Sequence, residues 1–216
     1  MDRGKFGKGL MELIGTGILL LTIQVSVSLG AAMAPVAIGV VLITIVYAGG
    51  PISGAHYNPA ISLAVMLRGK MSMHEMVSYW AFQIVGGYLG ALLGGIISGS
   101  FAVIAVGGES TGFQAFLAEV VFTFLLCFVV LGVATHSKAD GNSYYGAAIG
   151  LVVMSGAITV GPISGGAFNP AVALGLGLSK GMANMGYVLV TVVANLVGGA
   201  VAAGCFYAVS SDQLNA

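Results

Sequence analysis

Long uncharged runs of mostly apolar residues, separated by short charged segments, dominate the pattern of this chain. An ionised side chain at the centre of a bilayer costs about 3 kcal/mol or more, so charges indicate where a chain leaves the hydrocarbon. Such a pattern is typical of a protein that crosses a membrane several times. The runs without Asp, Glu, Lys or Arg are residues 13–67, 76–108, 120–137, 141–179 and 181–211.

The lengths of these runs predict how often the chain crosses a membrane. A transmembrane helix takes about 20 residues. The run 13–67 therefore holds two crossings, with a turn near 30–35, and leaves a remainder too short to cross; the run 141–179 holds one crossing and a similar remainder. We expect an all-α membrane protein with two re-entrant half-helices. Its six transmembrane helices are expected at about 10–32, 36–50, 76–99, 113–136, 144–161 and 183–208.

The composition agrees with a membrane protein and excludes other classes. Hydrophobic residues make up 58% of the 216 residues, charged residues make up 6%, and the mean hydropathy is +1.03. Basic and acidic residues number 7 each, so no net field attracts a nucleic acid. Cys127 and Cys205 lie in apolar stretches, which predicts buried free thiols. No spacing of residues indicates a metal, a cofactor or a catalytic site. Because most of the chain is apolar, we expect the lipid bilayer to be its partner.

The distribution of basic residues predicts the orientation of the chain. The count of crossings places all of them except Lys180 at segments on one side. By the positive-inside rule we expect both termini in the cytoplasm, and we expect the plasma membrane as the location. The first apolar run is too long for a signal peptide, so we expect its helix to be retained. The basic residues on the expected cytoplasmic side are Arg3, Lys5, Lys8, Arg68, Lys70 and Lys138.

An internal repeat divides the chain into two halves. Residues 50–60 read GPISGAHYNPA and residues 161–171 read GPISGGAFNPA, which is an offset of 111 residues. Each half also carries one glutamate early in its first helix, Glu12 and Glu119. Three full helices per half is an odd number, so the second half must be inverted relative to the first. We expect one transmembrane domain over 1–216, with inverted repeats at about 8–105 and 113–210.

Each predicted half-helix begins with Asn followed by Pro. Asn is a favoured N-cap, and Pro is favoured at the first helical position because its missing N–H has no intrahelical partner there. Asn58 and Asn169 therefore cap half-helices that run from Pro59 to about Leu67 and from Pro170 to about Leu178. Non-helical backbone at membrane depth must be buried in protein or line a wet cavity. We expect the two caps to meet near the midplane, preceded by close turns at Gly54 and Gly165.

These features resemble the aquaporin, or major intrinsic protein, family over essentially the whole chain. The resemblance implies a passive channel rather than an enzyme, for water or small neutral solutes, assembled as a homotetramer. It implies that the amides of Asn58 and Asn169 orient the solute at the pore centre, that His56 lines the pore, and that Glu12 and Glu119 support the re-entrant loops by accepting backbone hydrogen bonds. The two Asn-Pro-Ala boxes that carry it are Asn58, Pro59, Ala60 and Asn169, Pro170, Ala171.

The chain departs from the family at the expected selectivity constriction. Most members carry arginine three residues after the second Asn-Pro-Ala asparagine, and here that residue is Val172. The other constriction positions, carried over by their spacing, are Ile38, Ala157 and Gly166. With no charge and no bulky ring, we expect a wide and apolar constriction with weak selectivity among water, ammonia, hydrogen peroxide, urea and short polyols. An apolar ring can also dewet and close a pore, and the sequence does not separate these two cases.

Other readings of the same pattern remain. An ion-coupled secondary transporter also uses inverted repeats and broken helices, but apart from Glu12 and Glu119 the spans hold no acidic side chain. An intramembrane hydrolase would have to use Ser53 with His56, and no nucleophile motif supports it. A closed, junction-like structural protein of the same fold is the third alternative. His56 has a plainer reading too, as a packed histidine that supports its loop.

Overall fold

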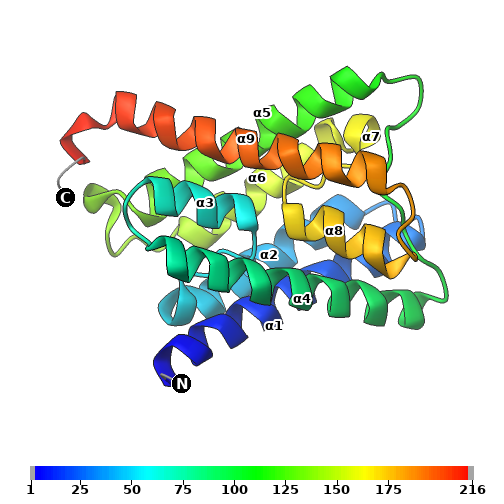
Figure 1. Cartoon of the computed structure of the whole chain (residues 1–216), viewed down its shortest axis with the longest axis horizontal. Coiled ribbons are helices and arrows are strands. Elements are labelled where there is room, and N and C mark those ends of the chain that lie inside the picture. The colour runs from blue at the N-terminus through cyan, green and yellow to red at the C-terminus, as the bar shows by residue number, and fades with distance from the viewer. Residues whose placement is uncertain (1–2, 214–216) are drawn as a thin grey trace.

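The computed structural model describes residues 3–213, and these residues form helices joined by short loops (Figure 1). Part of the orientation prediction rests on the side chain of Arg3 and on the chain ends, which lie outside the described residues. The long helices are α1 (Arg3–Ser28), α2 (Ala34–Ser53), α4 (Met73–Ser98), α5 (Gly112–Ala134), α6 (Tyr145–Thr159) and α9 (Met185–Val209). The short ones are α3 (Pro59–Leu67), α7 (Gly161–Ser164) and α8 (Pro170–Ser179), with single 3-10 turns at Ser137–Ala139 and Ser211–Gln213.

The predicted all-α membrane fold is confirmed, with differences at the helix ends. Among the described residues, α1, α2, α4, α5 and α9 are long and apolar enough to cross a membrane. Helices α1, α2, α4 and α5 all begin earlier than predicted. The extension is largest for α1 and α4, because a helix can continue past the hydrocarbon into charged residues. The first turn of α4 is an example, since Ser72 and Glu75 form a capping box there.

The sixth helix, α6, ends at Thr159 and is shorter than the predicted span to 161. The β-branched residues Thr159 and Val160 lower helix propensity, and Pro162 cannot donate to the preceding turn. The chain therefore restarts as α7 at Gly161. The matching helix of the first half, α2, instead continues through Pro51 to Ser53, past its predicted end at 50.

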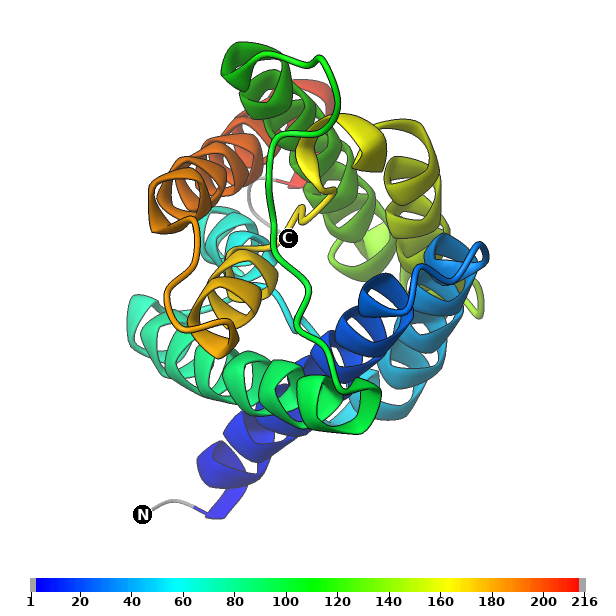
Figure 2. The ribbon, with the colours of Figure 1, turned by 90° about the vertical axis from the view of Figure 1, so that its right-hand side faces the viewer.

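The two halves run in opposite directions and pack in the same way. In Figure 1, α1 begins at the left of the molecule and α5 begins at the right. Helix α1 packs against α4 in the first half, and α5 packs against α9 in the second, while α2 meets α6 between the halves. Viewed from one end, the long helices surround the short ones (Figure 2). This is the inverted arrangement that the odd number of crossings predicts.

Small residues allow the close crossing of α1 and α4. A Cβ on Gly90 would overlap the carbonyl oxygen of Gly17, and a Cβ on Gly86 would overlap that of Leu13. Helices in lipid associate through such close contacts because no hydrophobic force drives them together. The glycine spacing in α4 therefore sets the distance between the two helices that carry the support of the first re-entrant loop.

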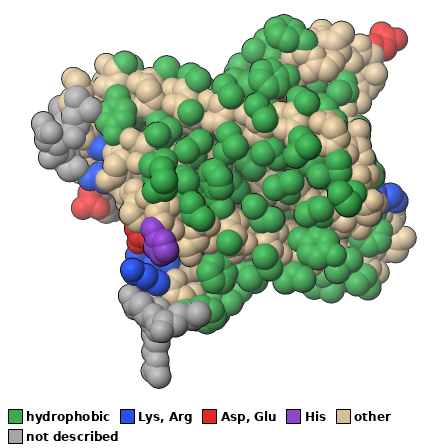
Figure 3. Space-filling model, viewed as in Figure 1, with side chains coloured by type: hydrophobic (Ala, Val, Ile, Leu, Met, Phe, Trp, Pro, Cys, Tyr) green, Lys and Arg blue, Asp and Glu red, His purple; other side chains and the backbone are tan. Residues whose placement is uncertain are grey.

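The outer surface fits a lipid environment. Apolar side chains cover the middle of the face in Figure 3, and basic side chains lie at its two ends. Large hydrophobic side chains such as Val85, Leu89 and Leu93 of α4 are exposed on the outside of the helix bundle. A surface of this kind is stable in hydrocarbon and would drive aggregation in water.

Candidate functional site

Helices α3 and α8 begin at the centre of the molecule, where their N-termini face each other (Figure 1). Asn58 and Asn169 are the N-caps, each with extended backbone and a side-chain oxygen that accepts from the amide two residues later, at 2.9 Å. The preceding helices end at Gly54 and Gly165, whose φ angles of +88° and +85° suit glycine. The local chemistry predicted from each Asn-Pro pair is present in both halves.

The two caps are tied to each other across the centre. Asn58 Nδ2 donates to the carbonyl oxygen of Phe168 at 2.8 Å, and Asn169 Nδ2 donates to the carbonyl oxygen of Tyr57 at 2.8 Å. Each of these carbonyls belongs to the residue just before the opposite cap. A side-chain amide has two hydrogens, so each asparagine keeps one N–H beyond this reciprocal pair. The ties hold both amide groups and both positive helix ends at one point.

Glu12 supports the first re-entrant loop from α1. Its carboxylate accepts hydrogen bonds from the backbone N–H groups of His56 (3.0 Å) and Tyr57 (2.6 Å). It also accepts from the hydroxyl of Ser53 (2.6 Å) and from Nε2 of Gln83 (2.8 Å). Glu12 is fully buried, where an unpartnered carboxylate is expensive. Four donors therefore converge on the two oxygens of this carboxylate.

Glu119 supports the second loop from α5 with the same set of donors. It accepts from the backbone N–H groups of Ala167 (2.9 Å) and Phe168 (2.8 Å) and from the hydroxyl of Ser164 (2.8 Å). The fourth donor is Nδ2 of Asn195, at 2.8 Å. Gln83 and Asn195 are fully buried, and the sequence reasoning did not single out either one. The only sequence feature that could have identified them is an amide side chain near the same place in the last helix of each half.

The loop residues beside the caps have a strained backbone that packing holds in place. Tyr57 and Phe168 have φ angles of +50° and +48°, which side chains rarely adopt. The Tyr57 ring occupies a notch left by Gly15 and Gly49, where a Cβ would overlap the ring. Its hydroxyl donates to the carbonyl oxygen of Ile45 at 3.0 Å. This strained turn directs the backbone N–H groups toward the buried carboxylate.

A cavity of about 320 Å³, which we call the central cavity, passes beside the paired caps. Asn58 and Asn169 both line it, together with His56. The four positions that the sequence analysis assigned to the constriction also line the wall of this cavity. These are Ile38, Ala157, Gly166 and Val172.

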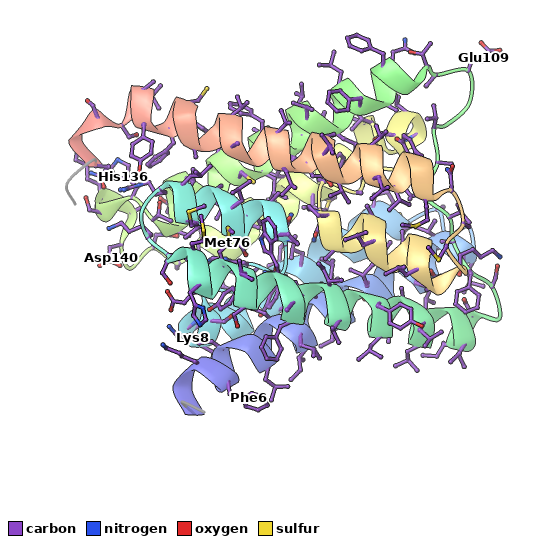
Figure 4. All side chains as sticks on the ribbon, viewed as in Figure 1. Phe6, Lys8, Met76, Glu109, His136 and Asp140 are labelled. Carbon is purple, nitrogen blue, oxygen red and sulfur yellow. The ribbon has the colours of Figure 1, made fainter. Side chains whose placement is uncertain are left out.

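A second cavity of about 700 Å³, which we call the mouth cavity, lies at the end of the molecule where α1 begins. His56 lines both cavities, so it stands where they adjoin. Charged side chains line the mouth cavity, and Figure 4 shows three of its lining residues, Lys8, His136 and Asp140, at that end. Glu109 lies at the opposite end in the same view. These labelled side chains therefore lie at the two ends of the molecule.

An extended segment that the sequence did not reveal crosses the other end of the molecule. In Figure 2 the strand-like connection between α4 and α5 runs across the middle of the helix ring. Asn184 Nδ2 donates to the carbonyl oxygen of Ile104 at 2.9 Å, and Gly107 N donates to that of Ile163 at 2.9 Å. Residues Ala102, Val103 and Ile104 of this segment line the central cavity. They add further apolar surface to it.

The remaining site residues take the following places. Pro59 and Pro170 occupy the first position of their half-helices, and Ala60 and Ala171 are fully buried behind them. The cysteines are both free, but only Cys127 is buried; Cys205 is half-buried, so the prediction of a buried thiol was wrong there. It lies on α9, which borders the outside of the bundle. Among the described residues, no group of three or more His, Cys, Asp or Glu is placed to hold a metal ion.

Comparison with known proteins points to one family. Aquaporin NIP1-1 of Zea mays is 34% identical over 148 residues, which is 66% of this chain and 51% of that protein. Nodulin-26 of Glycine max is 34% identical over 146 residues, covering 63% of this chain and 51% of its own length. The chain thus spans about half the length of these relatives.

Structural comparison and the family profile agree with this result. The X-ray structure of the aquaglyceroporin from Plasmodium falciparum shares the fold, with a TM-score of 0.82, 21% identity, and coverage of 98% of this chain and 100% of that one. Residues 5–207 match the profile of the family described as Major intrinsic protein. Because that match extends over nearly the whole sequence, the chain belongs to the major intrinsic protein family.

Proposed function

We propose that the protein is a passive channel, not an enzyme, for water and small neutral solutes, and that the solute passes through the mouth and central cavities. The observation that carries the proposal is the lining of the central cavity. Both cap asparagines and all four constriction positions face that one space. The names of the relatives, an aquaporin and an aquaglyceroporin, support the same class of solute.

The paired helix ends explain how such a channel excludes cations. Each helix N-terminus carries about half a positive charge, and α3 and α8 direct both toward the same point. Apolar walls add a second barrier, because an ion that loses its hydration shell gains no replacement ligands from them. A neutral solute meets neither penalty to the same degree. It can accept the N–H that Asn58 and Asn169 each keep beyond their reciprocal ties.

The constriction predicts weak selectivity. Val172 replaces the arginine that most family members place there, so this position contributes neither a charge nor hydrogen-bond donors. Ala157 and Gly166 are small, and Ile38 is aliphatic. We expect water, ammonia, hydrogen peroxide, urea and short polyols to pass, with discrimination by size rather than by hydrogen bonding.

The setting of the channel is part of the proposal. We place it in the plasma membrane as a homotetramer with one pore in each subunit, as the family resemblance implies. The mouth cavity is assigned to the cytoplasm because Lys8 and Lys70 line it, in agreement with the positive-inside rule.

The alternatives predicted from the sequence have weaker support. A proton-coupled transporter needs a carboxyl group that exchanges protons with the pathway, but Glu12 and Glu119 are fully buried and each is engaged by four donors. A hydrolase would need the hydroxyl of Ser53 paired with the ring of His56, but Nδ1 of His56 contacts Ser62, and the Ser53 hydroxyl donates to Glu12. A closed, junction-like protein is an outcome of the experiment below.

Stopped-flow permeability of proteoliposomes tests the proposal. The native protein is expected to raise permeability to water, urea and glycerol above that of bare lipid, whereas a closed structural protein would not. Val172→Arg is expected to reduce urea and glycerol passage more than water passage, because the guanidinium narrows the constriction. Val172→Met is the matched control, since it adds length without charge. If Val172→Arg leaves all solutes unchanged, Val172 does not line the constriction.

A further inference from the structure

Ser62 of α3 has three polar neighbours, although it faces no solvent. Its hydroxyl oxygen lies 3.0 Å from Nδ1 of His56, 3.1 Å from Nε2 of Gln83, and 3.3 Å from the carbonyl oxygen of Asn58. A serine hydroxyl has one hydrogen to donate and two lone pairs that accept. The three neighbours therefore compete for a small and countable set of hydrogen bonds.

The role of Gln83 among these neighbours is fixed. Its Nε2 also donates to the carboxylate of Glu12 at 2.8 Å, and a reversed amide would place its oxygen against that carboxylate. Gln83 must therefore donate to Ser62, which fills one lone pair of the hydroxyl. The carbonyl of Asn58 can only accept. His56 Nδ1 is the one neighbour that can either donate or accept, depending on the tautomer of the ring.

Two arrangements satisfy the Ser62 hydroxyl, Nδ1 of His56 and the carbonyl of Asn58. In the first, Ser62 donates to Nδ1 of His56, and the ring carries its hydrogen on Nε2. In the second, Ser62 donates to the carbonyl of Asn58, and Nδ1–H donates to Ser62, so Nε2 is bare. The first arrangement leaves no carbonyl unpaired, because the Asn58 oxygen also accepts the backbone N–H of Ser62 at 3.1 Å. The two arrangements exchange by rotation of one hydroxyl and relocation of one ring proton.

We propose that Ser62 is a positioning residue that lets Nε2 of His56 act either as donor or as acceptor toward the passing solute. The inference rests on the proposed channel function, since it needs His56 to face the pathway where the central and mouth cavities adjoin. Water and ammonia both donate and accept hydrogen bonds. A histidine that matches either orientation offers them a hydrogen bond without requiring them to turn.

The second half of the chain supports a role in solute passage rather than in folding. There, Ala167 stands at the position of His56 and Ala173 at that of Ser62. The carboxylate support is nevertheless complete, and Thr123 takes the second hydrogen bond of the amide of Asn195, at 3.0 Å. A re-entrant loop of this type thus forms without a histidine and serine pair. The pair is an addition to the first half.

Other charged and titratable groups do not replace Ser62 as the partner of Nδ1. Glu12 of α1 accepts from the backbone N–H of His56, not from its ring. Tyr79 of α4 packs edge-on against the ring at 5.3 Å, and its hydroxyl donates to the carbonyl of Ser53. The mouth cavity is lined from other elements by the charged side chains of Lys8, Lys70, Glu75 and Asp140 and by the imidazole of His136.

Nitrogen NMR of the full chain, labelled in its histidine rings and reconstituted in lipid at pH 8, tests the proposal. That pH is well above the ordinary pKa of histidine, so the ring is neutral. The signals of His56 are those lost in His56→Gln. The native protein is expected to show both tautomers, as two sets of signals or as their average. A native ring fixed in one tautomer overturns the proposal, and this test needs no further variant.

Variants separate the role of Ser62 from general damage to the fold. Ser62→Ala leaves the Gln83 hydrogen and Nδ1 facing the same space, so the ring is expected to adopt the Nε2–H tautomer alone. Ser62→Thr keeps the hydroxyl and is expected to restore both tautomers. Thr123→Ala, the matched control, removes the buried hydroxyl that accepts from Asn195 in the second half and is expected to leave the His56 signals unchanged. If Ser62→Ala also leaves them unchanged, Ser62 does not set the tautomer.

Permeability of the same samples completes the test. Loss of one hydrogen bond of ordinary strength is expected to slow water and ammonia by about fivefold in Ser62→Ala, with recovery in Ser62→Thr. If Ser62→Ala changes the tautomer of His56 while its permeability stays equal to that of the native protein, the link between the His56 tautomer and solute passage is overturned. Absence of native permeability overturns the proposed function instead, and the NMR result tells these failures apart.

Discussion

The carboxylate of Glu119 offers the sharpest test of what holds a re-entrant loop in place, through the substitution Glu119→Gln. The glutamine has nearly the same shape but replaces one acceptor oxygen by an NH₂ group. Whichever oxygen is replaced, the new hydrogens face a backbone N–H, that of Ala167 on one side or Phe168 on the other. Ser164 can turn its hydroxyl to accept, but a backbone amide cannot. One buried N–H is therefore left without an acceptor.

The size of the effect follows from these contacts. An unsatisfied buried donor costs about 1–3 kcal/mol, and the remaining hydrogen bonds lose the strength that an ionised acceptor gives them. A total of about 3 kcal/mol is expected, which is a large part of the 5–15 kcal/mol typical of a folded domain. For a chain of this size it corresponds to a fall in Tm of about 6 to 12 °C.

Thermal unfolding in a mild detergent, followed by intrinsic fluorescence, measures the change. Glu109→Gln is the matched control, because Glu109 is exposed in the segment between α4 and α5 and its charge supports no loop. Glu12→Gln is expected to behave like Glu119→Gln, since the two sites have the same set of donors. If Glu119→Gln unfolds at the same temperature as Glu109→Gln, the four hydrogen bonds do not stabilise the loop as argued.

Two further substitutions probe the helix crossing and the pore centre. Gly90→Ala places a methyl group against the carbonyl of Gly17 and is expected to lower Tm by several degrees. Gly132→Ala is the control, because its Cβ would meet nothing within 4 Å, and its Tm should stay unchanged. Equal Tm values for the two variants would mean that α1 and α4 can separate without cost. Asn169→Asp keeps an acceptor for the N-cap but puts a negative charge where two helix ends add positive charge, so a cation leak is expected in a potassium flux assay of proteoliposomes. Gln114→Glu is its control, because it adds the same charge at the exposed start of α5 and keeps the acceptor of the capping box, and a leak in both variants or in neither would contradict the electrostatic argument.

Much of the fold follows from local chemistry in the sequence. Charges and run lengths predict the crossings, and the Asn-Pro pairs predict the starts of α3 and α8 to the residue. The half-helix ends are also close, since Leu67 is the last residue of α3 and α8 extends one residue past the predicted Leu178. These features depend on residues that are near one another in the chain. Local rules therefore suffice for them.

The rest depends on contacts between distant residues. Gln83 reaches Glu12 only because α4 crosses α1 closely at its glycines, and the sequence contains no motif for that pairing. The place of Ile104 in the cavity wall is set by Asn184, which is far away in the chain. Helix α6 ends at Thr159 because the β-branched residues there lower helix propensity, although the apolar run continues beyond this point. Each of these features is a tertiary outcome that a pattern of types and spacings does not contain.

The central claim is that a neutral solute passes beside two paired helix ends through an uncharged constriction. The most direct measurement is the permeability of native proteoliposomes to water, glycerol and potassium ions under matched osmotic gradients. We predict water and glycerol passage well above bare lipid with no potassium passage. Permeability equal to bare lipid for both neutral solutes, or potassium passage comparable to that of glycerol, would contradict the account.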